Sequence, residues 1–154
     1  LGRTIKPELS GREAKEYGVW ARSVLERGTP GLARLVAEIT DEFNHNAGVL
    51  RTIDGGFVRC GSKSAALNYK LQSGGAILMK KACTIARDTI RARGIDAMLV
   101  GNIHDEFQYD VHPRDVEAVG EVIVQAIASA GEALGCRVPF TGAWKDGQNW
   151  AECH

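Results

Sequence analysis

One long apolar stripe constrains the fold of this chain more than any other feature. Between about Ser64 and Arg93, apolar or weakly polar side chains recur at spacings of three, four and seven residues, which places them on one face of an α-helix. At about 1.5 Å per residue, this helix is predicted to be roughly 45 Å long. The stripe consists of Leu67, Leu71, Leu78, Ala82, Ile85 and Thr89.

Two adjacent glycines, Gly74 and Gly75, interrupt the predicted helix. A glycine in a helix interior costs on the order of 1 kcal/mol relative to alanine. We therefore expect a neighbouring element or a ligand backbone to come close to the helix at this point.

A β-hairpin is predicted after the long helix. The apolar-rich runs Ala97–Ile103 and Phe107–Val111 flank the tripeptide His104-Asp105-Glu106, and polar Gln108 and Asp110 alternate with apolar neighbours in the second run. Two adjacent carboxylates at a hairpin tip cannot both be buried without a counter-charge. They face solvent, a cation or a metal, and a site made only of oxygen ligands suits Mg²⁺.

The remaining segments predict an α+β fold. We expect a helical hairpin, a short β-hairpin around Asp54-Gly55-Gly56, a further helix closed by Gly135, and an irregular C-terminal segment. The predicted ranges are Ser10–Arg27 and Pro30–Asn46 for the helical hairpin, Val49–Cys60 for the short β-hairpin, Pro113–Leu134 for the last helix and Cys136–His154 for the irregular end.

Charge is distributed unevenly along the chain, although the formal net charge is zero. Residues 51–93 contain nine Lys and Arg against two Asp, a net charge of +7, and residues 94–134 contain one Arg against eight Asp and Glu, a net charge of −7. A cationic segment beside an acidic one is typical of an anionic ligand held next to a metal site, and solvated helix faces give the same count. Any contact with DNA is expected through a local patch rather than the overall charge.

The cysteines and the apolar runs bear on the cellular environment. Cys60, Cys83, Cys136 and Cys153 form no Cys-x-x-Cys pair, so we expect reduced thiols and neither a zinc site nor a disulfide framework. No leader and no membrane-length apolar run is evident, so a soluble protein without a membrane partner, cytoplasmic in a bacterial or phage-infected cell, is expected.

A polar ridge accompanies the apolar stripe on the long helix. Ser64, Asn68 and Gln72 follow each other at intervals of four residues and therefore share one helix face. Amide side chains both donate and accept hydrogen bonds, which suits base-pair edges in a minor groove. A solvated helix face is the alternative. Lys70, a cation of the same segment, completes the predicted DNA-binding set.

Three motifs in this order resemble those of family A DNA polymerases, the DNA polymerase I-like family, in its T-odd podophage type. The string Ala65–Ala76 resembles the family's "ALN…LQ…GA" helix, His104-Asp105-Glu106 resembles its motif C, and Asn149–His154 is similar to the C-terminus of its phage replicases. Asp54-Gly55-Gly56 stands where the family has a "DGR" turn. Ser64 and Gly56 depart from the pattern, which has Arg or His at the first position and Arg at the second.

The resemblance implies a C-terminal palm segment with adjoining fingers helices, whose motif C hairpin packs against long helices. It implies that Asp105 is a ligand of two Mg²⁺ ions that align the primer 3′-hydroxyl with the dNTP. It also implies that Glu106 supports this site, that His104 lies near the terminal primer phosphate, and that Asn68 and Gln72 contact the primer-template DNA.

The family's upstream "DxSxxE" strand and "RxxxKxxx[FY]xxxYG" helix are not found in residues 1–154. We expect Leu1 to lie just beyond that helix, and the N-terminal polymerase portion to be supplied in cis or in trans. The chain alone is expected to be inactive as a DNA-directed DNA polymerase. Two alternatives are a non-enzymatic DNA-binding remnant or accessory fragment, which would bind duplex DNA independently of Mg²⁺, and a metal-dependent phosphohydrolase, which needs more clustered ligands.

Overall fold

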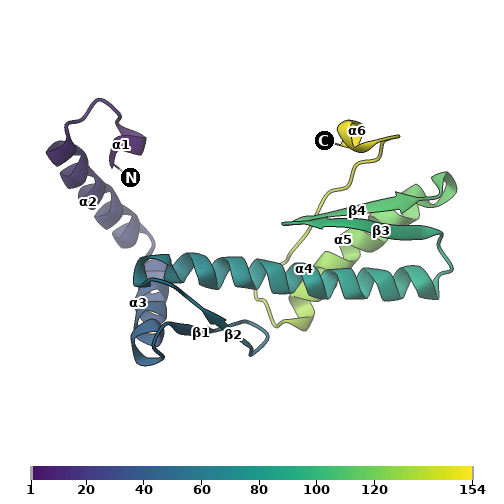
Figure 1. Cartoon of the computed structure of the whole chain (residues 1–154), viewed down its shortest axis with the longest axis horizontal. Coiled ribbons are helices and arrows are strands. Elements are labelled where there is room, and N and C mark those ends of the chain that lie inside the picture. Colours follow the sequence, from purple (N-terminus) through teal and green to yellow (C-terminus); the bar gives the residue numbers. More distant parts are fainter. Residues whose placement is uncertain (1, 154) are drawn as a thin grey trace. The chain divides into compact units, whose positions relative to one another are not determined.

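The computed structural model describes residues 2–153, and these form two compact units. Unit 1 comprises residues 2–50 and 59–67, and unit 2 comprises residues 51–58 and 68–153. Figure 1 shows the order of the elements along the chain. They are α1 Gly2–Ile5, α2 Gly11–Gly28, α3 Pro30–His45, β1 Val49–Arg51, β2 Phe57–Arg59, η1 Lys63–Ala65, α4 Ala66–Ala92, β3 Ala97–Ile103, β4 Glu106–Val111, η2 Pro113–Asp115, α5 Val116–Ala133 and α6 Trp150–Cys153.

Unit 1 begins with helices whose ends follow local chemistry. The Glu13 carboxylate accepts hydrogen bonds from the backbone N–H and the hydroxyl of Ser10, at 3.1 and 2.5 Å, and these bonds fix the start of α2. Pro30 opens α3 in the first helical turn, where its missing N–H costs nothing. Both helices match their predicted ranges to within one residue.

The predicted antiparallel packing of α2 and α3 is wrong. Thr29 alone connects the two helices, and reversing the chain into a helical hairpin takes about two to five residues. The helices therefore meet at an angle (Figure 1), and apolar side chains on α2 stay exposed. The exposed residues are Val19, Trp20, Val24 and Leu25.

The base of the β1–β2 hairpin contributes to the core of unit 1. Leu50 is fully buried, and the Cys60 N–H donates to the Gly48 carbonyl at 2.7 Å. Gly48 has φ +82°, and a Cβ there would lie 2.9 Å from the Cys60 carbonyl oxygen. Glycine is required at this position for both reasons.

Unit 2 is built on α4, which starts at Ala66 rather than at Ser64 because Lys63–Ala65 form a 3₁₀ turn. The buried residues of α4 in this unit begin at Leu78 and continue through Met79, Ala82, Ala86 and Ile90. Leu71 was predicted to be part of the apolar stripe, but it is 60% exposed. The prediction failed because the β3–β4 hairpin and α5 pack only on the C-terminal half of α4.

Two aromatic side chains of the C-terminal segment pack against glycines of α5. A Cβ on Gly120 would lie 2.3 Å from the Trp144 ring, and a Cβ on Gly131 would lie 2.7 Å from the Phe140 ring. These contacts fix a segment that has little regular structure apart from α6, as predicted for Cys136–His154. No helix in residues 2–153 combines the length and the apolar character needed to cross a membrane.

Candidate functional site

The predicted hairpin is formed by β3 and β4, with a tighter tip than expected. Ile103 pairs directly with Glu106, so the turn consists of His104 and Asp105 alone, and Glu106 is the first residue of β4 rather than part of the turn. His104 has φ +55°, a left-handed conformation that is uncommon for residues other than glycine and is enriched in His, Asn and Asp. Such backbone outliers concentrate at functional sites.

The two carboxylates of the predicted motif have different surroundings. The Asp105 carboxylate is exposed and makes no hydrogen bond or ion pair with any residue between Gly2 and Cys153. Glu106 is half-buried, and its Oε1 accepts a hydrogen bond from the Gln108 side-chain amide. The structure therefore leaves Asp105 available to a ligand and holds Glu106 beside it in place.

A β-bulge in β3 determines which side chains of this strand lie on each face of the hairpin. Leu99 pairs with Tyr109 and Gly101 pairs with Gln108, so Val100 is an extra residue without a partner. The bulge places Met98 and Ile103, five residues apart, on the same outer face of the hairpin. The polar side chains of β4, from Glu106, Gln108 and Asp110, share that face, as the alternation in the sequence predicted.

The inner face of the hairpin packs on α4 and α5. Phe107 contacts the cluster of Leu78, Met79 and Ala82, and Tyr109 contacts the cluster around Ala86 and Ile90. The hairpin thus returns along α4 from its C-terminal end, and the tip points toward the N-terminal half of the helix. Asn68 and Gln72 lie there, both exposed, and Gln72 is about 9 Å along the axis from Leu78 at 1.5 Å per residue.

The other two predicted DNA-binding residues have different settings. Lys70 is half-buried in α4, and its backbone carbonyl accepts a hydrogen bond from the Ser73 hydroxyl. Ser64 lies in η1 rather than on the α-helix and belongs to unit 1, where its hydroxyl is 3.3 Å from that of Ser62. Ser64 therefore does not continue the ridge of Asn68 and Gln72.

The glycine pair in α4 does not break the helix. A Cβ on Gly74 would make an ordinary contact with Ile53 at 3.8 Å, and no atom lies within 4 Å of a Cβ on Gly75. The predicted close approach is thus limited to the β1–β2 turn at Gly74, and the side of Gly75 is open. An open, amide-bearing half of α4 precedes the half that packs under the hairpin.

One carboxylate at the tip meets part of the requirement of a magnesium site. Mg²⁺ takes one or two protein carboxylates and fills its other positions with water and phosphate oxygens. Within the described part of the chain, no group of three His, Cys, Asp or Glu side chains is arranged to hold a metal ion. Asp105 can therefore supply one ligand of a magnesium ion, and the described residues do not group two further side chains of this kind with it.

A buried hydroxyl lies beneath the hairpin. The Tyr109 hydroxyl is shielded from solvent and has no hydrogen-bond partner among residues 2–153. Burial raises the pKa of Tyr109, and the nearby Cys83 thiol adds to that shift. Tyr109 and Cys83 line a cavity of about 250 Å³ between α4 and the strands. The alternation of β4 predicted that Tyr109 faces inward, but nothing in the sequence indicated an unpartnered hydroxyl.

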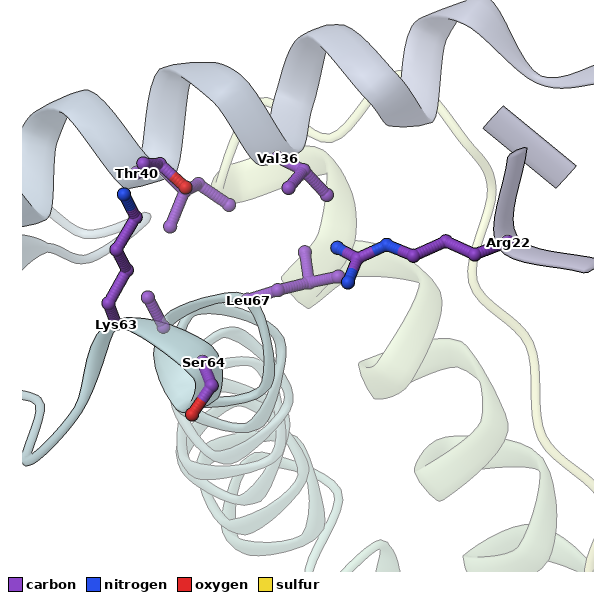
Figure 2. A pocket seen from close by; sticks show the side chains of 8 residues that line it. Arg22, Val36, Thr40, Lys63, Ser64 and Leu67 are labelled. Carbon is purple, nitrogen blue, oxygen red and sulfur yellow. The ribbon is translucent and has the colours of Figure 1, made fainter. Parts of the chain in front are cut away.

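A second cavity lies in unit 1, and no sequence motif predicted it. Its volume is about 570 Å³, and Arg22 of α2 and Lys63 of η1 approach it from opposite sides (Figure 2). These two cations are 41 positions apart in the sequence. Only the fold of unit 1 brings them to the same cavity.

Comparison with known proteins decides the family. A family model described as DNA polymerase family A matches residues 51–152, which include β2, α4, the β3–β4 hairpin and α5. The chain belongs to DNA polymerase family A. This family A segment includes the exposed turn at Asp105 and the exposed amides of Asn68 and Gln72.

Individual relatives are similar over parts of the chain. The DNA-directed DNA polymerase of Escherichia phage Phieco32 is 33% identical over 58% of this chain and 14% of its own length. DNA polymerase I of Aquifex aeolicus is 34% identical over 48% of this chain and 13% of its own length. The DNA-directed DNA polymerase of Enterobacteria phage T3 is 31% identical over 68% of this chain and 16% of its own length. The matches thus cover 13 to 16% of the length of these three relatives.

A solved structure has the same fold. The POL domain of Pol1 from M. smegmatis, in complex with DNA primer-template and dNTP, superposes with a TM-score of 0.65 at 18% identity. The match covers 81% of this chain and 23% of that chain. The predicted α+β arrangement, with a small antiparallel hairpin on long helices, is confirmed.

Proposed function

We propose that this chain is the C-terminal part of the catalytic domain of a DNA-directed DNA polymerase, and that Asp105 is one of its metal-binding carboxylates. The observation that carries the proposal is the free carboxylate of Asp105 at the tip of a rigid hairpin in a family A chain. A carboxylate without an internal partner keeps all its lone pairs for a ligand. The inner face of the hairpin, packed on α4 and α5, holds it in place.

In this proposal Asp105 binds Mg²⁺ together with carboxylates from the rest of the polymerase. When bound, Mg²⁺ supplies charge stabilisation for in-line phosphoryl transfer from dNTP to the primer 3′-hydroxyl. Glu106, held by Gln108, adds negative potential beside Asp105 and orients the start of β4. His104 extends the turn toward the primer phosphate at the terminus.

The open half of α4 binds the primer-template in this proposal. Asn68 and Gln72 are exposed and one helical turn apart, so both amides reach one ligand surface. They donate to the minor-groove acceptors of the newest base pairs. Lys70, as part of the cationic segment, lies next to the sugar-phosphate backbone, where its positive charge contributes to affinity without sequence preference.

The N-terminal portion of the polymerase covers exposed apolar surface in this proposal. Met98, Val100 and Ile103 of β3 are 63%, 60% and 40% exposed. Apolar side chains gathered on one strand with a free edge mark a protein interface. Because this surface adjoins the turn, the covering portion also brings the remaining metal ligands to Asp105.

Primer extension tests the proposal. The chain is combined with the phage T3 polymerase from which the matching segment has been removed, in trans or as a fused chimera, and extension of a labelled primer is measured with Mg²⁺. We expect extension by the combination, none by either part, and none with Asp105→Ala. Asp110→Ala, on the same hairpin, is the matched control and should retain extension.

Two results would contradict the proposal. Undiminished extension by Asp105→Ala would remove Asp105 from the metal site. A folded chimera that binds primer-template without extending it, with an affinity independent of Mg²⁺ and steeply dependent on salt, would identify the chain as the DNA-binding remnant instead.

A further inference from the structure

The cavity beneath the β3–β4 hairpin is lined only by residues of unit 2, and its volume is about 250 Å³. One face of α4 forms a wall, because residues at helical spacing line the cavity. These residues are Cys83, Arg87, Ile90 and Arg91. The strands form the other wall with Ala97, Met98, Leu99 and Tyr109. Since sites for drug-sized ligands occupy roughly 300–1,000 Å³, this cavity suits a smaller molecule.

The lining is apolar except for one thiol, one hydroxyl and two guanidiniums. Ile90 is almost completely buried, whereas Met98 is 63% exposed, so the cavity is open on the side of β3. The Tyr109 hydroxyl is shielded from solvent and has no hydrogen-bond partner among residues 2–153. A buried hydroxyl without a partner destabilises the fold, and a ligand that carries an acceptor atom would remove this cost.

Two arginines give the cavity its charge. Arg87 and Arg91 are exposed and one helical turn apart, so both guanidiniums reach one small ligand. Arg87 Nη2 lies 2.9 Å from the Asp88 carboxylate, and Arg91 forms no ion pair with any residue between Gly2 and Cys153. Two guanidiniums against one carboxylate leave a net charge of +1. This charge matches a monoanion better than a phosphate monoester, whose charge at neutral pH is about −1.5 to −2.

We propose that this cavity binds a small organic monocarboxylate, with its apolar body between Ile90 and Leu99 and its carboxylate at the two arginines. A guanidinium and a carboxylate form charge-assisted hydrogen bonds, which are frequently bidentate. The Tyr109 hydroxyl donates to a carboxylate oxygen. The ligand thus gives this buried donor the partner that no described residue of the chain supplies.

This site is independent of the proposed polymerase function. It includes neither Asp105 nor the predicted DNA-binding residues Ser64, Asn68, Lys70 and Gln72. Its ligand contacts both α4 and the hairpin, so binding should stabilise the folded chain. Failure of either proposal would leave the other standing.

Isothermal titration of the full chain at neutral pH tests the proposal with probes of matched shape. Benzoate, benzamide and benzamidinium share one planar skeleton and are negative, neutral and positive. We expect benzoate to bind about ten-fold or more tightly than benzamide, because only the anion forms charge-assisted hydrogen bonds with the arginines. Benzamidinium should not bind measurably. Acetate, which lacks the ring, should bind about ten-fold more weakly than benzoate, because it buries less apolar surface.

Substitutions locate the binding in the cavity. Arg91→Gln and Tyr109→Phe should each weaken benzoate about five-fold, because each removes a hydrogen bond to the carboxylate. Arg93→Gln and Tyr69→Phe change exposed residues outside the cavity and are the matched controls. Circular dichroism confirms that each variant is folded.

Three results would overturn the inference. Equal affinity for benzoate and benzamide, or no measurable binding of either, would mean that the arginines bind no carboxylate here. Equal weakening by the cavity variants and their controls would mean that benzoate does not occupy the cavity. Tighter binding of phenyl phosphate than of benzoate would mean that the ligand is not a monocarboxylate.

Discussion

The two β-hairpins of this chain both carry an aspartate at the turn, and the two carboxylates have opposite environments. Asp54 Oδ1 accepts hydrogen bonds from the Thr52 hydroxyl and from the Gly56 N–H, at 3.1 Å for the latter. Asp105 accepts none from the described residues. Asp54 closes its own turn, whereas the turn at Asp105 is held by strand pairing and by the packing beneath it, which leaves its carboxylate for an external partner.

Isosteric amide substitutions in the two turns should give the largest contrast. In the completed polymerase, Asp105→Asn should lower the rate of primer extension by about 10³-fold or more, because the proposed role of Asp105 as a metal ligand would support several kcal/mol of transition-state stabilisation. Asp54→Asn should leave the rate within about two-fold. The rates are measured by single-turnover extension. Similar losses of rate in the two variants would contradict the inference that only the Asp105 carboxylate has an external partner.

Substitutions in the N-terminal half of α4 should have the next largest effect on primer extension. Asn68→Ala and Gln72→Ala should each lower the efficiency of extension about ten-fold, because each removes an amide that, in the proposed function, donates hydrogen bonds to base-pair edges. Thr84→Ala, an exposed polar position farther along α4, is the control. If discrimination against a mismatched primer terminus stays the same in both alanine variants, these amides do not read the base pair.

The layer beneath the second hairpin predicts a gain in stability. Tyr109→Phe should raise the free energy of unfolding by about 1 kcal/mol, because it removes a buried hydroxyl without a partner. Tyr69→Phe, at an exposed position of α4, should have no effect. Urea denaturation measures both, and a destabilised Tyr109→Phe variant would show that the hydroxyl has a partner in solution.

The same tyrosine predicts how stability depends on alkaline pH. Burial raises the pKa of Tyr109 above its ordinary value of 10.0, so the folded state keeps the proton more tightly than the unfolded state. The associated stability is present below pH 10 and is lost as the pH rises through the higher folded value. The wild type should lose more stability there than Tyr109→Phe.

The smallest effect is expected on stability at acid pH, from Asp54 in the turn of the β1–β2 hairpin. The Thr52 hydroxyl and then the Gly56 N–H hold the pKa of Asp54 below its ordinary value of 3.8. The stability that this provides is present above pH 3.8 and is lost as the pH falls through the lower folded value. Asp54→Asn should slightly lower the melting temperature at neutral pH and should remove this acid dependence, and Asp110→Asn should do neither.

Much of this architecture was predictable from local chemistry. Local contacts within a few residues determine structure at three places: the Ser10 cap of α2, the proline at the start of α3 and the alternation in Phe107–Val111. The hairpin that contains Asp105 was predictable for the same reason. Family membership followed from three motifs in order, and the comparisons confirm it.

The failures share a physical cause, which is contact between distant segments. Leu71 fits the apolar period of α4, and its exposure depends on how far the hairpin and α5 extend along the helix. The angle between α2 and α3 is the exception, because it depends on a local connection of one residue. Arg22 and Lys63 share a cavity through the fold of unit 1 alone, so no local pattern indicated it.

The bulge at Val100 makes β3 unusually tolerant of one change in chain length. Because Val100 has no partner on β4, its removal would leave every other residue of the strand on its present face. In a regular strand without a bulge, removal of one residue would instead move a run of side chains to the opposite face. A shortened variant without Val100 should therefore fold with less twist and aim the tip in a new direction. In this strand, insertion and deletion adjust the direction of the Asp105 carboxylate, while substitution adjusts its chemistry.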